Sequence, residues 1–164
     1  MRASMARSSA WLLFAALLLA TELCRAAASC SISATGPAFG VYNYSNPSPT
    51  LADGTVTASC NWVSGGSTTV NLVTSYSTGL SGSYANRHMV LGGSFLLYNI
   101  YFDVNFQQIR GDGTGGSQTG GASLTVSKTA PTAEASSTIY GRMPAGQDVP
   151  PGTYTDTIVI TMTY

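Results

Sequence analysis

The fold of this chain is decided by the stretch Thr153-Tyr154-Thr155-Asp156-Thr157-Ile158-Val159-Ile160-Thr161-Met162-Thr163-Tyr164. From residue 158 onward its odd positions are threonine except for Val159, and its even positions are apolar, namely Ile158, Ile160, Met162 and Tyr164. Successive side chains of a β-strand point to opposite faces of the sheet, so an alternation of this kind indicates a strand. The pattern therefore predicts a strand with one buried face.

We expect this strand to close the chain, with no later segment to pair with its far edge. A long, uncharged and β-branched strand with an unpaired edge is a template for aggregation. An exported protein that carries such a strand needs a partner that covers it. We therefore predict that Ile158, Ile160, Met162 and Tyr164 line one wall of an acceptor groove and pair with a strand from another molecule.

Residues 1–28 have the pattern of a secretory signal peptide. Arg2 and Arg7 precede an apolar run over residues 10–20, and Ala26-Ala27-Ala28 offers a cleavage site of small residues. The apolar run is too short to span a bilayer, and no later segment is longer. Cleavage after Ala28 predicts an exported protein with one domain over residues 29–164 and no transmembrane segment in the mature chain.

The predicted mature chain carries few charges, and its net charge is near minus two. Its basic residues are Arg87, Arg110, Lys128 and Arg142, and its acidic residues are Asp53, Asp103, Asp112, Glu134, Asp148 and Asp156. Proteins that bind nucleic acid usually present a cluster of basic residues, and this sequence has none. Nucleic acid is therefore not an expected partner.

Two cysteines, Cys30 and Cys60, remain after removal of the leader. Disulfides form and persist in exported proteins, so we predict that these two residues are joined. Both fall on the apolar face of a predicted strand, and we expect the bond to lock the end of the fold opposite the acceptor groove. The pair does not suffice for a metal site, because His88 is the only histidine. The sequence indicates no cofactor.

No segment of the mature chain has a helical period, and short alternating runs are separated by turns rich in Gly, Pro and Asn. The strand candidates are residues 30–35, 39–44, 55–63, 68–75, 87–91, 95–106, 123–127, 138–143 and 153–164. Residues 95–106 are the longest apolar segment and are predicted to form one central strand. The fold class that follows is all-β, an immunoglobulin-like β-sandwich.

Two features that suggest other functions have simpler explanations. Arg110-Gly111-Asp112 spells the integrin-binding tripeptide, but it opens a Gly-rich turn, and we interpret it as accidental. Asp112 and Asp148 lie in turn-like sequence, and Asp156 begins a strand, where aspartate commonly bonds backbone amides. Acid-base catalysis by a pair of carboxyl groups needs the two in different environments, and no nucleophile motif is present. We predict that the protein is not an enzyme.

Three stretches carry a resemblance to a known family. They are Tyr98-Asn99-Ile100-Tyr101-Phe102-Asp103, Gly111-Asp112-Gly113-Thr114-Gly115-Gly116, and Ile139-Tyr140-Gly141-Arg142-Met143-Pro144-Ala145-Gly146-Gln147-Asp148-Val149-Pro150-Pro151-Gly152-Thr153-Tyr154-Thr155-Asp156-Thr157. With the two cysteines and the final alternating strand, they resemble the spore coat protein U domain, the family that also contains the pilin subunits of archaic (Csu-type) chaperone-usher pili. The similarity runs from Cys30 to Tyr164.

The resemblance implies an immunoglobulin-like sandwich that lacks its last strand. In that family a periplasmic pilus chaperone lends a strand to the subunit, and the N-terminal extension of a neighbouring pilin subunit replaces it during assembly at an outer-membrane usher. The resemblance thus implies passage through the periplasm to a fimbrium at the cell surface, with roles in adhesion or biofilm.

The segment ahead of Cys30 departs from the family pattern. Pilins that polymerise carry an alternating apolar extension there, whereas cleavage after Ala28 leaves only Ser29, and residues 21–29 do not alternate. We therefore expect a subunit that accepts a strand and does not donate one, placed at a fibre tip or as a minor subunit. The alternative is a free-standing secreted spore-coat or matrix protein with a self-complete sandwich.

Overall fold

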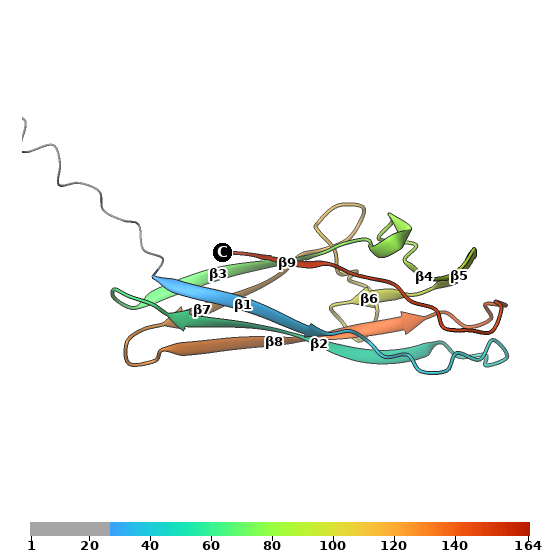
Figure 1. Ribbon diagram of the computed structural model, residues 1–164, viewed down its shortest axis with the longest axis horizontal. Coiled ribbons are helices and arrows are strands. Elements are labelled where there is room, and N and C mark those ends of the chain that lie inside the picture. The colour runs from blue at the N-terminus through green and yellow to red at the C-terminus, as the bar shows by residue number, and fades with distance from the viewer. Residues whose placement is uncertain (1–26) are drawn as a thin grey trace, which may run out of the picture.

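The computed structural model describes residues 27–164, which form an elongated all-β domain (Figure 1). All but the last two residues of the predicted leader lie outside this range. One short 3-10 turn, η1 (Gly79–Ser81), interrupts the strands. The strands are β1 (Ala28–Thr35), β2 (Thr50–Trp62), β3 (Thr68–Tyr76), β4 (His88–Leu91), β5 (Ser94–Leu97), β6 (Asn99–Tyr101), β7 (Gly120–Val126), β8 (Thr132–Met143) and β9 (Ile160–Thr163).

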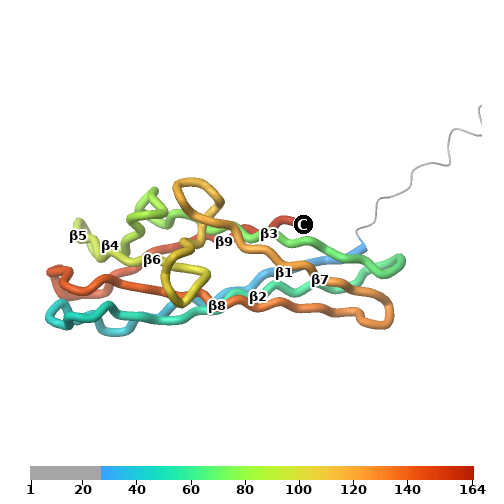
Figure 2. Tube along the Cα trace, turned by 180° about the vertical axis from the view of Figure 1, so that it is seen from behind, coloured from blue at the N-terminus to red at the C-terminus, as the bar shows by residue number. Residues whose placement is uncertain are grey.

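Two antiparallel sheets face each other as a sandwich. The first has the strand order β1-β2-β8-β6 and the second the order β7-β3-β9, while β4 and β5 form a separate hairpin. Figure 2 shows the same two layers from behind, with β3 and β7 on one side and β2 and β8 on the other. The predicted fold class, an immunoglobulin-like β-sandwich, is confirmed.

Two apolar clusters fill the space between the sheets. The inward residues of β2 contribute to both, because Val56 belongs to the first cluster and Ala58 and Cys60 to the second. The alternation in residues 55–63 therefore predicted the buried face of this strand correctly. The other buried members are Tyr76, Leu96, Tyr98, Ile100, Ile139 and Met143 in the first cluster, and Ala28, Leu72, Leu124 and Val126 in the second.

The prediction of one central strand over residues 95–106 was wrong. The chain leaves β5 at Tyr98, whose backbone N–H donates to the Arg87 carbonyl (2.9 Å), and β6 ends at Tyr101. The Asp103 carboxylate then accepts hydrogen bonds from the backbone N–H groups of residues 105, 107 and 108, which closes a turn. A short acidic side chain that bonds nearby amides ends a strand regardless of the apolar residues around it. Residues 39–44, another strand candidate, are not in a strand either.

Asp53-Gly54 lies inside β2, although this dipeptide often marks a turn. A Cβ atom on Gly54 would collide with the carbonyl oxygen of Thr35, where the chain leaves β1. Gly141 in β8 is similar, because a Cβ there would come within 2.8 Å of the Phe39 ring and of the Ala52 oxygen. In both strands glycine permits the close approach of another segment.

Candidate functional site

The edge of β9 that faces away from β3 has no partner strand within residues 27–164. β9 pairs with β3 from Ile160, opposite Tyr76, to Thr163, opposite Val73. Upstream of this ladder, the Ser77 N–H donates to the Val159 carbonyl (2.9 Å), and Thr155 exchanges two backbone hydrogen bonds with Val90 of β4. The terminal segment is thus held along one side only.

The hydrogen bonds to β3 determine which backbone groups of β9 remain available. In an antiparallel pair, alternate residues point their N–H and C=O groups toward the partner strand. The hydrogen bond from the Ser77 N–H to the Val159 carbonyl shows that the odd residues of the segment direct their N–H and C=O groups toward β3. The N–H and C=O groups of Ile160 and Met162 therefore point to the open edge.

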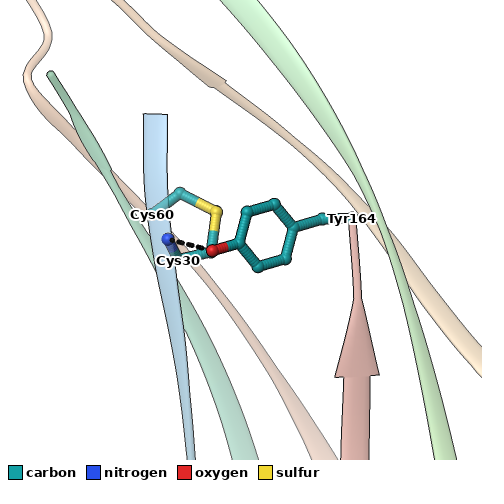
Figure 3. Close-up of a disulfide and its surroundings, with 3 residues drawn as sticks. All are labelled: Cys30, Cys60 and Tyr164. Atoms are coloured by element: carbon teal, nitrogen blue, oxygen red, sulfur yellow. Dashed lines mark hydrogen bonds between the residues drawn. A yellow bond between two sulfur atoms is a disulfide. The ribbon is translucent and has the colours of Figure 1, made fainter. Parts of the chain in front are cut away.

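β1 presents a second open edge, because it pairs only with β2. The Cys30 N–H donates to the hydroxyl oxygen of Tyr164 (3.4 Å), so this N–H is directed away from β2. By the same alternation, the backbone groups of Ile32 and Ala34 also point outward. Figure 3 shows the Tyr164 side chain reaching across to β1 beside the disulfide.

An apolar pocket of about 250 Å³ lies between these two edges. Ala34 lines it from the β1 side, and Ile158 and Ile160 line it from the β9 side. Its remaining apolar walls come from Pro37, Phe39, Tyr76, Met89, Tyr98, Ile100 and Ile139. We call the open edges of β1 and β9, with this pocket, the β1–β9 groove. Its geometry suits an extended chain that bonds to both edges and inserts alternate apolar side chains.

The four predicted groove residues divide into two groups. Ile158 and Ile160 are half-buried and pack against the first cluster, and Met162 is half-buried against the second. Tyr164 is 62% exposed and packs in neither cluster. The alternation of even positions predicted that Tyr164 lies on the buried face. The pairing of β9 with β3 ends at Thr163, however, so it does not fix the face on which residue 164 lies.

Cys30 and Cys60 form the predicted disulfide within the second cluster (Figure 3). They are paired residues of β1 and β2. The expectation that the bond locks the end of the fold opposite the groove was wrong, because Cys30 is hydrogen bonded to Tyr164 at the end of β9. Antiparallel strands bring the start of β1 to the end of β9, which the sequence pattern alone does not reveal.

Asp156 anchors the terminal segment where it enters the groove. Its carboxylate accepts hydrogen bonds from the backbone N–H of Leu80 (2.8 Å) and of Thr157 (2.7 Å) and from the Tyr98 hydroxyl (2.7 Å). Burial, and then the bond to Asp156, raise the pKa of Tyr98 well above its ordinary value. Asp156 therefore bonds backbone amides, as predicted, although it precedes β9 and does not begin a strand.

Sequence reasoning missed two fully buried arginines, Arg87 and Arg110. Arg110 donates to the Tyr76 hydroxyl (2.5 Å) and to the carbonyls of Tyr101 (3.0 Å) and Thr138 (2.6 Å), and its guanidinium carbon lies 4.0 Å from the centre of the Phe102 ring. These contacts join β3 of one sheet to β6 and β8 of the other. Because Arg110 is buried, the tripeptide that it begins does not present an arginine to a receptor.

Among residues 27–164, no group of three or more His, Cys, Asp or Glu side chains is arranged to hold a metal ion. No helix in this range is long and apolar enough to cross a membrane. Asp112, one of the carboxylates considered for catalysis, accepts hydrogen bonds from the Thr114 hydroxyl (2.6 Å) and N–H (2.9 Å), which lower its pKa. It stabilises a turn at the surface.

Comparison with known proteins shows similarity to a protein family and to solved structures. The family described as Spore Coat Protein U domain matches residues 15–161. Among solved structures, the chain is similar to the CsuC-CsuE chaperone-tip adhesion subunit pre-assembly complex from archaic chaperone-usher Csu pili of Acinetobacter baumannii, with 19% sequence identity and a TM-score of 0.48. That similarity covers 84% of this chain and 40% of the other. No curated protein matches the sequence.

Proposed function

The chain belongs to the Spore Coat Protein U domain family, and from that premise we propose that it is an exported structural subunit of a chaperone-usher pilus, which accepts a β-strand from another protein. Its function is structural and not catalytic. Its partners are a periplasmic chaperone, an outer-membrane usher and neighbouring pilin subunits. It passes through the periplasm and functions in a fimbrium at the cell surface.

The observation that carries this proposal is the pair of open edges that border one apolar pocket, the β1–β9 groove. A strand inserted there would hydrogen bond to Ile160 and Met162 on one side and to β1 on the other. Each backbone hydrogen bond contributes about 0.5–1.5 kcal/mol net. Apolar side chains that enter the pocket add about 25 cal/mol for each Å² removed from water. The sandwich is thus incomplete by one strand, and the partner supplies it.

We further propose that the subunit stands at a fibre tip or is a minor component. A shaft subunit must donate a strand as well as accept one. Residues 21–29, ahead of Cys30, lack the alternation of apolar side chains that fills such a groove. The N-terminal sequence of the mature protein tests this point, since a longer alternating arm would contradict it.

Substitution of Ile160 by aspartate tests the groove. In the expected complex the Ile160 side chain faces the pocket, where a carboxylate would be buried without a partner at high free-energy cost. We expect Ile160→Asp to reduce co-purification of the chaperone at least tenfold, while export and the disulfide are retained. The matched control is Val159→Asp, because Val159 is 60% exposed on the other side of the same segment.

Unchanged co-purification with Ile160→Asp, or an equal loss with Val159→Asp, would contradict the proposal. Expression without any pilus chaperone gives a second measurement. A subunit with an open groove should aggregate or be degraded under those conditions. Recovery of a soluble, stable monomer would favour the free-standing coat or matrix protein.

A further inference from the structure

We propose that the outer face of β6 and β8 holds a binding site for a small oxyanion, a phosphate, sulfate or carboxylate group, formed by Arg142, Tyr101 and Arg87. A pocket of about 220 Å³ is lined by these three residues together with Asn86 and Asn99. It is a different pocket from that of the β1–β9 groove, although Tyr98 lines both, and the site does not depend on the proposed pilus function.

The strand register brings the two arginines to the same place. Ile100 belongs to the core, so Asn99 and Tyr101 point to the opposite, outer face of β6. Asn99 is paired with Arg142 of β8, which puts these side chains side by side on that face. The oxygen of the Asn99 side chain accepts a hydrogen bond from Nη1 of Arg87 (2.8 Å). Asn99 thus bonds the Arg87 guanidinium and lies opposite Arg142 across the strand pair.

Arg87 is fully buried and bonds only to neutral oxygens. Its Nη2 donates to the carbonyls of Ser77 (2.8 Å) and Arg110 (2.7 Å), and its Nε is buried without a partner in the part of the chain that the structure describes. A buried charge without a counter-ion and a buried N–H without an acceptor both carry a free-energy cost. Burial accordingly lowers the pKa of Arg87.

Arg142 is the accessible member of the pair. Within residues 27–164 its guanidinium has no hydrogen-bond acceptor, and it lies 5.7 Å from the centre of the Phe106 ring. Asp103 bonds the amides of its own turn, and Asp156 bonds Tyr98 and two amides, so neither carboxylate is hydrogen bonded to Arg87 or Arg142, although the charge of Asp156 acts on Arg87 through space. Among residues 27–164, neither guanidinium is therefore hydrogen bonded to a carboxylate.

The pocket also offers a neutral donor. Burial raises the pKa of Tyr101, although the charges of Arg142 and Arg87 oppose this effect, so the phenol keeps its proton near neutral pH. A planar guanidinium binds carboxylate, phosphate or sulfate through two parallel hydrogen bonds. The space far exceeds one water molecule, whose share of liquid volume is about 30 Å³. An oxyanion on Arg142 and Tyr101 would offset the charge of both arginines.

The test is a calorimetric titration of the purified protein, with its chaperone if the two are recovered together. Sodium phosphate, sodium sulfate and sodium acetate are titrated separately at constant ionic strength, with sodium chloride as the balance. We expect saturable binding of at least one anion, weakened at least tenfold by Arg142→Gln and less by Tyr101→Phe. Lys128→Gln, which removes an exposed charge in the loop between β7 and β8, should leave affinity unchanged.

The variants and anions separate the outcomes. Tighter binding of phosphate or sulfate than of acetate would identify a tetrahedral group as the ligand, and the reverse would identify a carboxylate. Phosphate and sulfate also stabilise proteins generally by exclusion from the surface, which raises thermal midpoints without saturation and equally in every variant. The proposal would be contradicted if this general stabilisation were seen without saturable binding. It would also be contradicted if Arg142→Gln and the unchanged protein bound the anion equally well. Arg87→Gln is not used, because its loss threatens folding.

Discussion

The two ends of the β1–β9 groove are built differently. At one end Ile158 and Ile160 border an apolar pocket of about 250 Å³. At the other end Met162 packs against the second cluster, and Tyr164 bridges to Cys30 beside the disulfide. One alternating sequence therefore produces an open end and a bridged end. Alternation determines the face on which a side chain lies, but the neighbouring strands determine what lies beneath it.

The largest effect is expected at the bridged end, from removal of the disulfide. The bond closes a loop with a sequence separation of 30, and in the chain-entropy model such a loop stabilises the fold by about 3 to 4 kcal/mol. The double variant Cys30→Ser with Cys60→Ser should lower the free energy of unfolding by that amount. Denaturant unfolding measures it.

The matched control for the disulfide is the next cross-strand pair, Ser31 and Ser59. Their replacement by alanine should change the free energy of unfolding by less than about 0.5 kcal/mol, as expected for surface positions. If the serine pair and the cysteine pair had equal effects, the second cluster would not depend on the bond, and the contrast between the two ends would weaken.

The next effect concerns Tyr98, which lines the pocket at the open end. Burial and the hydrogen bond to Asp156 raise its folded pKa, so the neutral phenol stabilises the fold. This contribution is complete below the unfolded pKa of about 10 and is lost as pH rises above it, by up to about 1.4 kcal/mol for each pH unit. Unfolding measured from pH 9 to 11 should show this slope, and Tyr98→Phe should reduce it. An identical slope in both proteins would contradict the assignment.

Truncations of Ile158 and Met162 compare the two ends directly. Ile158 packs against the first cluster but also lines the open pocket, so Ile158→Ala should weaken binding of the incoming strand, by about 1–2 kcal/mol or roughly fivefold to thirtyfold, in addition to lowering the free energy of unfolding. Met162 already packs against the second cluster, so Met162→Ala should mainly lower the free energy of unfolding, by about 1–2 kcal/mol. Chaperone affinity and denaturant unfolding, measured on both variants, distinguish the effects. Equal changes in both quantities for both variants would show that the groove is uniform.

The features that sequence predicted are those with a local cause. Alternation identified the terminal strand, although only residues 160–163 of the predicted 153–164 form β9, and the buried face of β2; the predicted export signal with two remaining cysteines predicted the disulfide. Each of these depends on a period of two or on the cellular compartment. No contact between distant segments was needed to infer them.

The features that sequence missed depend on distant segments. Arg87 bonds to the carbonyls of Ser77 and Arg110, which nothing near residue 87 signals. Gly54 permits the approach of Thr35, although the same dipeptide would suit a turn. The position of the disulfide beside Tyr164 likewise follows from the order of strands in two sheets. These facts became accessible only with the topology.

The smallest effect is expected from Tyr164→Phe, which removes the hydroxyl that accepts the Cys30 N–H. This bond is long, at 3.4 Å, and its tyrosine is 62% exposed, so its loss should lower stability by less than about 1 kcal/mol. An incoming strand needs the same N–H, and the variant should therefore take up a strand faster, by no more than about tenfold. Stopped-flow binding of a strand peptide measures the rate. Tyr154→Phe is the control, since its hydroxyl also makes one hydrogen bond, by donating to the Pro150 carbonyl, but away from the β1 edge. Slower uptake by Tyr164→Phe would mean that the tyrosine guides the strand and does not bar it, which would make the bridged end the point of entry.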